Sequence, residues 1–113
     1  HPKISPIKAA IFPIVKKQRY EKLAEKIFDM LKKEFNVLHD KSGSIGRRYS
    51  RNDEIGTPYC ITIDEKSLKN KDVTIRDRDT KKQIRVKISD LKSMLKSLIE
   101  QEIGFLKAGK AVK

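Results

Sequence analysis

The chain has 113 residues and a formal net charge of +12, from 27 lysines and arginines against 15 aspartates and glutamates. This length suits one compact domain and is small for a complete metabolic enzyme, while the charge indicates an acidic partner, with RNA or DNA ahead of an anionic membrane surface. The single cysteine, Cys60, excludes an internal disulfide and favours a reducing compartment, and no apolar run approaches the roughly 20 residues that a membrane helix needs.

The first part of the chain predicts a strand, a helix and a second strand. Residues 7–14 are almost continuously apolar, which is typical of a short strand buried on both faces of a parallel sheet. Over residues 19–34 the apolar side chains recur with the period of an amphipathic helix. Residues 35–39 predict a second short strand. Together these segments indicate a βαβ unit with a right-handed crossover.

A loop and a short basic helix follow in the sequence. Residues 40–46 are rich in glycine and serine, and Ser44 can cap a helix over about residues 46–55. A glycine and a proline then favour the end of that helix. We expect a third strand over residues 59–63.

The next segments predict a loop and a β-hairpin. Residues 64–72 are polar, so we expect a loop there. Residues 73–79 and 83–88 alternate between apolar and polar side chains and predict two antiparallel strands.

The chain ends in a predicted helix and tail. Ser89 can cap a helix that runs to about Glu102, and we expect residues 104–113 to fray. The predicted order is therefore β-α-β-α-β-β-β-α. It indicates a single α/β domain with a mixed sheet and helices against it, whose core covers about residues 5–103.

The predicted hairpin has two faces of different chemistry. One face is apolar and belongs to the core, with Val73, Ile75, Ile84, Val86 and Ile88. The other carries Thr74, Arg76, Arg78, Arg85 and Lys87. Arginine forks and lysines on rigid strands can read RNA bases and hold phosphates. They can equally form a cross-strand ladder in which the arginines pair with Asp77, Asp79 or nearby glutamates, and the residues alone leave both interpretations open.

The predicted basic helix carries Arg47, Arg48 and Arg51, of which the first and last share a face. A helix start beside a glycine- and serine-rich loop offers backbone N–H groups to an anion. The alternative is a solvated helix whose arginines pair with Asp53 and Glu54, and the residues do not decide between the two.

Enzyme and cofactor sites find little support in the residues. His1 and His39 lie beside no candidate nucleophile, and Cys60 in an apolar strand is best explained as a small buried hydrophobe. Asp77 and Asp79 share a face that could hold a metal, but the alternating arginines favour ion pairing. A nucleotide- or flavin-binding domain is disfavoured because no phosphate-binding fingerprint is present. We therefore predict no catalytic set, cofactor or metal in this chain.

Two motifs resemble a known family: SGSIGRRYSRNDEIGTPYCITID at residues 42–64 and VTIRDRDT at residues 73–80. Both are similar to the C-terminal anticodon-binding domain of archaeal and eukaryotic-type glycyl-tRNA synthetases, which are class II aminoacyl-tRNA synthetases. The histidyl, threonyl and prolyl enzymes share a looser pattern, Gly-x-Arg-x-x-x-x-Glu-x-x-Gly-x-Pro. This chain approximates it with Gly46, Arg48, Asp53 or Glu54, Gly56 and Pro58. The resemblance covers about residues 5–100.

The resemblance implies a five-stranded mixed sheet flanked by three helices, with the tRNA anticodon loop held beside the sheet. It implies that the two motifs bind tRNA through Arg47, Arg48, Arg51, Glu54, Arg76, Asp77, Arg78 and Asp79. Lys16 and Lys17 are candidate phosphate contacts on charge grounds, and Arg85 is a further candidate from the polar side of the hairpin. The carboxylates among these residues can contribute to anticodon recognition, because they can accept a hydrogen bond from N4 of the cytosines in a glycine anticodon.

The class II catalytic domain is absent from this sequence, which also begins at His1 rather than at methionine. We therefore expect a fragment that does not itself aminoacylate. The parent that the resemblance implies is an ATP- and magnesium-dependent glycine–tRNA ligase, a cytoplasmic homodimer whose partner is tRNA-Gly. The alternative is a non-catalytic accessory or structural domain of the same fold that has lost anticodon reading, as in some polymerase subunits. The intact GRRY and RDRD elements favour the ligase.

Overall fold

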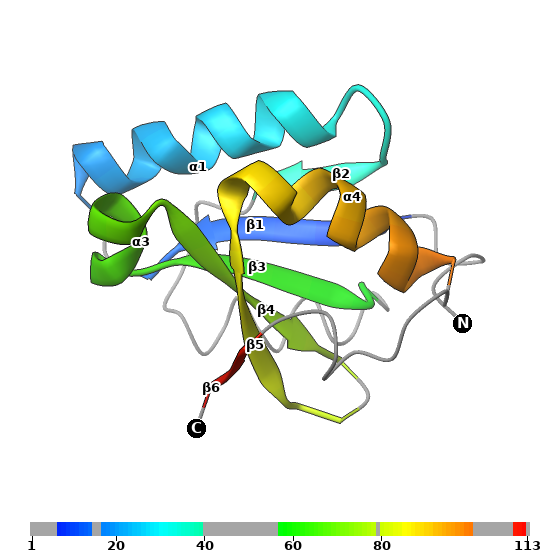
Figure 1. Ribbon diagram of the computed structural model, residues 1–113. Helices are drawn as coiled ribbons and strands as arrows, with labels where there is room; N and C mark the ends of the chain where they lie inside the picture. The colour runs from blue at the N-terminus through cyan, green and yellow to red at the C-terminus, as the bar shows by residue number, and fades with distance from the viewer. Residues whose placement is uncertain (1–6, 15–16, 40–56, 79, 101–109, 113) are drawn as a thin grey trace.

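The computed structural model describes residues 7–14, 17–39, 57–78, 80–100 and 110–112 (Figure 1). Within these residues the elements are β1 (Ala9–Pro13), α1 (Gln18–Leu31), β2 (Val37–His39), β3 (Tyr59–Ile63), α3 (Glu65–Asn70), β4 (Asp72–Asp77), β5 (Gln83–Lys87), α4 (Ile88–Ile99) and β6 (Lys110–Val112). The strands described form one mixed sheet in the order β2-β1-β3-β4-β5-β6. β1 pairs in parallel with β2 and β3, and the other neighbours are antiparallel.

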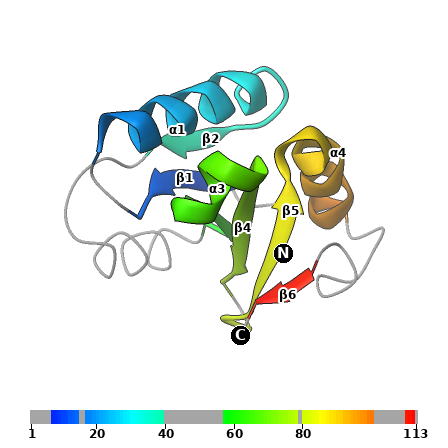
Figure 2. The ribbon, with the colours of Figure 1, turned by 60° about the vertical axis from the view of Figure 1, so that its left-hand side comes forward.

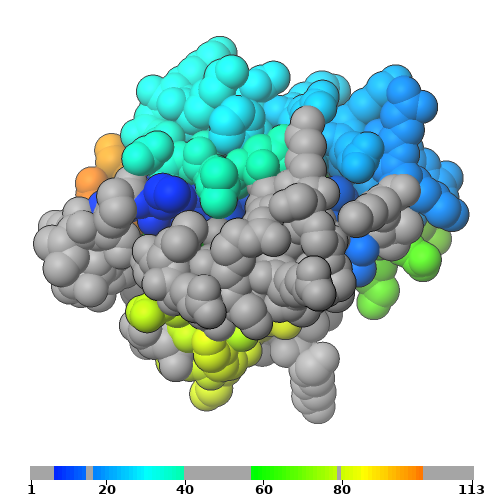
Figure 3. All heavy atoms as spheres, turned by 180° about the vertical axis from the view of Figure 1, so that it is seen from behind, coloured from blue at the N-terminus to red at the C-terminus, as the bar shows by residue number. Residues whose placement is uncertain are grey.

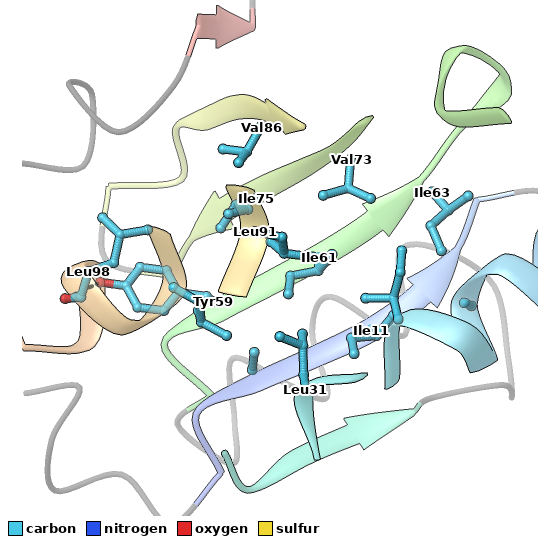
Figure 4. Close-up of a cluster of buried hydrophobic side chains, with 14 of the residues drawn as sticks. Ile11, Leu31, Tyr59, Ile61, Ile63, Val73, Ile75, Val86, Leu91 and Leu98 are labelled. Atoms are coloured by element: carbon cyan, nitrogen blue, oxygen red, sulfur yellow. Dashed lines mark hydrogen bonds between the residues drawn. The ribbon is translucent and has the colours of Figure 1, made fainter. Parts of the chain in front are cut away.

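The main hydrophobic core lies between one face of this sheet and the helices α1 and α4 (Figures 1 and 4). The helices contribute Tyr20, Ala24, Ile27, Leu31, Leu91, Leu95, Leu98 and Ile99, all of them buried. The Tyr59 hydroxyl donates a hydrogen bond of 3.2 Å to the Leu98 carbonyl and so joins β3 to α4 (Figure 4). Burying a leucine or isoleucine side chain contributes about 1.5–3 kcal/mol, so burial of this cluster is what holds α1 and α4 against the sheet.

The opposite face of the sheet changes from apolar to polar across the strands. Near the parallel strands, Ala10, Phe12 and Cys60 form a second buried cluster. Towards β4 the face becomes polar, and the hydroxyls of Thr62 and Thr74 are hydrogen-bonded to each other across the β3–β4 pair. We call the β4–β5 part of this side the polar face of the hairpin.

Most of the fold expected from the sequence is confirmed. The chain is an α/β domain with the predicted βαβ unit, and β3 has the predicted bounds. The predicted apolar side of the hairpin is buried, and Ile88 packs half-buried against the same cluster. The mixed sheet contains the five expected strands, to which β6 adds a sixth within the part of the chain that is described. None of the helices described is long and apolar enough to cross a membrane.

The loop expected over residues 64–72 is wrong, because α3 occupies most of it. A capping box begins this helix: the Ser67 N–H donates to the Asp64 carboxylate at 3.1 Å, and the Asp64 N–H donates to the Ser67 hydroxyl at 3.0 Å. These bonds satisfy N–H groups that a helix start leaves open, so they stabilise a helix that buries no apolar side chain of its own.

Two further expectations at the C-terminal end need correction. Ser89 does not cap the last helix: α4 begins at Ile88, its N-cap is Lys87, and no side chain bonds to the cap. Part of the tail expected to fray instead pairs antiparallel with β5, with Ile84 opposite Ala111. Backbone pairing along the sheet edge is the cause, and it depends on no side-chain pattern. The helix expected over residues 46–55 lies outside the residues described.

Candidate functional site

The polar face of the β4–β5 hairpin carries several of the predicted tRNA-binding residues. Strand register places Thr74 opposite Arg85 and Arg76 opposite Gln83. Thr74 is buried, whereas Arg76 is half-buried. Arg78 follows the end of β4 and is exposed, and its backbone N–H donates to the Pro58 carbonyl at 2.9 Å. That bond fixes the backbone of Arg78 beside the start of β3.

The turn between β4 and β5 is held by its own hydrogen bonds. The Asp77 N–H donates to the Lys82 carbonyl at 2.9 Å, and the Lys81 N–H donates to the Asp77 carbonyl at 2.8 Å. The Thr80 hydroxyl donates to the Asp77 carboxylate at 3.3 Å. Thr80, Lys81 and Lys82 are all exposed. Backbone bonds and the Thr80 hydroxyl therefore order this turn, whose two lysines are exposed.

Arg85, at the other end of the hairpin, is held by two carboxylates. One guanidinium nitrogen lies 2.6 Å from an oxygen of Asp64, and another lies 2.7 Å from an oxygen of Asp72. Burial opposes the ionisation of Asp64, but hydrogen bonds and charge from Arg85, with hydrogen bonds from Ser67, hold the pKa of Asp64 below its usual value. The hydrogen bond to Asp64, together with Asp72, raises the pKa of Arg85, against a smaller opposing effect of burial. Arg85 thus joins α3 to β4 and β5.

The structure brings together some of the predicted site residues and separates others. Arg76, Asp77 and Arg78 follow one another at the turn end of the hairpin, with Arg76 and Asp77 on opposite faces of the sheet. Lys17 is exposed at the start of α1, beyond the strand end where Pro13 is in register with Ile63, so it lies at the opposite end of the sheet. Six candidates lie outside the residues described: Lys16, Arg47, Arg48, Arg51, Glu54 and Asp79.

Lys81 and Lys82 lie next to this group and were not among the residues predicted to bind tRNA. Residues 80–82, TKK, lie between the two alternating segments, and their sequence predicts a turn. Two adjacent lysines in a turn beside the predicted arginines are the signal that could have added them to the candidates. Their position beside Arg78 makes the turn end of the hairpin the most cationic part of the described site.

The described residues offer little else that resembles a catalytic or metal centre. Among them, no three His, Cys, Asp or Glu side chains gather in a metal-binding group. The half-buried His39 ring lies 5.8 Å from the ring of Phe28, measured between centroids, and Cys60 is buried with Ala10 and Phe12. These are packing contacts of the fold.

Comparison with known proteins matches residues 8–98 to a family described as an anticodon binding domain. Over 96 residues the chain is 55% identical to the glycine–tRNA ligase of Rhodopirellula baltica, covering 85% of this chain and 18% of that protein. Over 103 residues it is 56% identical to the glycine–tRNA ligase of Clostridium kluyveri, covering 88% and 21%. The chain thus spans about a fifth of the length of these relatives.

Solved structures show the same fold at lower sequence identity. The prolyl-tRNA synthetase from Cryptosporidium parvum, complexed with L-proline and AMP, superposes with a TM-score of 0.82 at 23% identity. The superposition covers 88% of this chain and 23% of that one.

Proposed function

Because this chain belongs to the family of anticodon-binding domains, we propose that it recognises the anticodon stem-loop of tRNA-Gly as the C-terminal domain of a glycine–tRNA ligase. The observation that carries the proposal is the family match over residues 8–98, a range that includes the hairpin whose turn end gathers Arg76, Asp77 and Arg78. The names of the two bacterial relatives, each more than half identical to this chain, support glycine as the amino acid.

Arg76 and Arg78 are the proposed base-reading residues among those described. Arg76 belongs to a strand, and the backbone of Arg78 is bonded to that of Pro58, so little backbone entropy is lost when either side chain binds a base. Arginine recognises base edges with a planar fork and can also stack on unstacked bases. Asp77 already accepts a hydrogen bond from Thr80, and its remaining acceptor capacity suits N4 of a cytosine.

The other candidate residues have different roles in the proposal. Arg47, Arg48, Arg51, Glu54, Asp79 and Lys16 remain predictions from the motifs and from charge. Lys17 is proposed to contact a phosphate, since it is exposed and lies away from the base-reading group. Arg85 is proposed to support the hairpin rather than to touch RNA, because two carboxylates hold its guanidinium.

The whole ligase is proposed to be a cytoplasmic homodimer that uses ATP and magnesium to attach glycine to tRNA-Gly. Support comes from the names of the relatives, of which this chain covers about a fifth. In this proposal the chain contributes tRNA selection, and the aminoacylation chemistry belongs to the rest of the polypeptide.

The test compares binding of this chain to tRNA-Gly and to the same tRNA with altered anticodon bases over a salt series. Each base contact that is lost should lower affinity by about 5- to 150-fold, since a good bidentate contact discriminates by about 1–3 kcal/mol. Arg78→Gln should reduce this discrimination, whereas Lys17→Gln should weaken both RNAs alike. Equal affinity for both tRNAs at every salt concentration would leave only counterion-release binding and would favour an accessory domain without anticodon reading.

A further inference from the structure

An open groove lies where α1, α3 and the start of α4 meet, and we call it the α3 groove. Figure 2 shows α3 between α1 and the point where β5 leads into α4. The apolar lining of the α3 groove comes from Leu23, Leu68 and Ile88. Leu68 is 36% exposed, one of two large hydrophobic side chains that are exposed among the described residues. The groove volume of about 650 Å³ is in the range of sites that hold a ligand.

The polar lining of the α3 groove is cationic. Three exposed lysines line it: Lys26 from α1, Lys71 just after α3 and Lys87 at the end of β5. Within the part of the chain that is described, none of the three belongs to an ion pair, and no aspartate or glutamate lines the groove. Cations around open apolar surface are complementary to a partner that is both acidic and apolar.

Backbone bonds hold the walls of the α3 groove in place before any partner binds. The Ile88 N–H donates to the Lys71 carbonyl at 2.9 Å, which ties the start of α4 to the end of α3. Lys71 itself has φ 54°, a left-handed conformation in which helices commonly end. The capping box of Asp64 and Ser67 orders the other end of α3. A groove formed in advance loses little entropy when a partner occupies it.

The α3 groove is separate from the proposed base-reading end of the hairpin. β4 begins just after α3 and extends over six residues to Asp77, roughly 20 Å at about 3.3 Å per residue. Seen from behind, the green atoms of α3 lie beneath the blue atoms of α1 on the right, and the yellow-green hairpin atoms lie at the lower left (Figure 3). No aromatic ring is among the described residues that line the groove, so it offers no surface for stacking RNA bases. Its aliphatic lining favours a protein partner.

We infer that the α3 groove docks an acidic segment of a separate partner protein, which places an aliphatic side chain against Leu68 and carboxylates against the three lysines. Grooves that bind peptides combine an apolar anchor with surrounding charges in this way. A second copy of this chain suits the groove less well, because its net charge is +12. The inference does not depend on tRNA recognition.

The chain supplies a matched control for each groove variant. Leu68→Ala removes apolar surface inside the α3 groove, and Ile14→Ala removes the other exposed large hydrophobic residue, which is 42% exposed and outside the groove. Lys26→Gln removes a cation of the groove, and Lys96→Gln removes an exposed lysine in the last turn of α4, roughly 12 Å along that helix from its start. All four side chains are exposed, so none of these variants should change the thermal unfolding of the chain.

The probe is a short synthetic helical peptide of leucines and glutamates, titrated into the isotope-labelled chain and followed by NMR amide shifts. The largest shifts should lie in the α3 groove rather than in the hairpin turn. Leu68→Ala should weaken the peptide about fivefold or more, because it removes the apolar contact. Lys26→Gln should weaken it about two- to fivefold at low salt and less at high salt. Ile14→Ala and Lys96→Gln should stay within about twofold of the unsubstituted chain.

The same titration can overturn the inference. Peptides with serine in place of leucine, or glutamine in place of glutamate, should each bind more weakly, and unchanged affinity for either contradicts the assigned chemistry. A groove whose amides do not shift at about 1 mM of the original peptide would rule out this docking site. Equal losses in the groove variants and their controls would do the same.

Two further measurements decide between this partner and other occupants of the α3 groove. Lys26 lies roughly 13 Å along α1 from Lys17, beyond the screening length of roughly 8–10 Å, so Lys26→Gln should keep tRNA-Gly affinity within about twofold. If Lys26→Gln weakened tRNA-Gly as much as Lys17→Gln and left peptide affinity unchanged, the groove would be an RNA surface and the inference wrong. A peptide that binds this chain but not the intact ligase containing it would show that the rest of the ligase occupies the groove, which also overturns a separate partner.

Discussion

Arginines at the two ends of the β4–β5 hairpin have different roles, one structural and one in the proposed binding site. At the α3 end, Arg85 is 19% exposed and bridges Asp64 and Asp72. At the turn end, Arg78 is exposed and the neighbouring turn adds two exposed lysines. The alternation of a strand decides only which side chains share a face. Carboxylates from α3 and from the neighbouring strand decide that Arg85 is a structural residue, although it shares the polar face with Arg76.

The largest expected effect comes from breaking the structural end. Arg85→Met leaves Asp64 and Asp72 as two neighbouring, largely buried carboxylates without their cation. We expect a loss of about 2 kcal/mol in the free energy of unfolding, less than for a fully buried pair because these groups keep some solvent contact. Urea unfolding measures it.

The matched control for this substitution is Arg78→Met, which removes an exposed arginine at the turn end. It should change stability by less than about 0.5 kcal/mol while weakening tRNA binding. Should Arg85→Met instead keep full stability and lose tRNA affinity, the two ends of the hairpin have been assigned the wrong roles.

The next expected effect is a dependence of stability on pH, because Arg85 lowers the pKa of Asp64 at the structural end. The folded-state pKa of Asp64 lies below its ordinary value of 3.8. Its ionisation therefore contributes stability that is fully present above pH 3.8 and is lost as the pH falls through the folded-state pKa. Asp64→Asn should cost about 1.5 kcal/mol near neutral pH, since asparagine can still cap α3 but cannot pair with Arg85 as an ion.

The free energies of unfolding of the unsubstituted chain and of Asp64→Asn should therefore converge as the pH falls below 3.8. In an Arg85→Met background the same comparison should lose most of its pH dependence, because the guanidinium that lowers the pKa is gone. A constant difference between the chains from pH 6 to pH 2.5 would mean that Asp64 acts only as a helix cap.

The sequence predicts one end of the hairpin better than the other for a physical reason. The alternation over residues 73–79 and 83–88 is local, and it correctly buries Val73, Ile75 and Ile84. The partners of Arg85 are 13 and 21 residues away, and α3 carries one of them into place. No strand pattern contains that information, so the same alternation presents Arg85 and Arg76 as equivalent.

The elements that the sequence analysis missed lack the signal on which it depends. Residues 64–72 contain one apolar side chain, Leu68, so they have no hydrophobic periodicity that could predict α3. Their informative feature is Asp64 three positions before Ser67, which matches the spacing of a capping box but ends in serine rather than glutamate or glutamine. β6 forms by backbone pairing with β5, which depends on distance in space. The left-handed backbone of Lys81 could not be predicted either, because residues 80–82 (TKK) contain no glycine or asparagine to indicate it.

The smallest expected effects come from two serines near helix starts, Ser67 in α3 and Ser89 in α4. Ser67 is fully buried and closes the capping box that starts α3, so Ser67→Ala should lower the free energy of unfolding by about 1 kcal/mol. Ser89 is exposed inside the first turn of α4 rather than at its cap, and Ser89→Ala should change it by less than about 0.5 kcal/mol. Urea unfolding of both variants measures the difference. Because α3 carries Asp64 to Arg85, an unchanged free energy of unfolding in Ser67→Ala would mean that the α3 end of the hairpin owes its order to something other than this capping box.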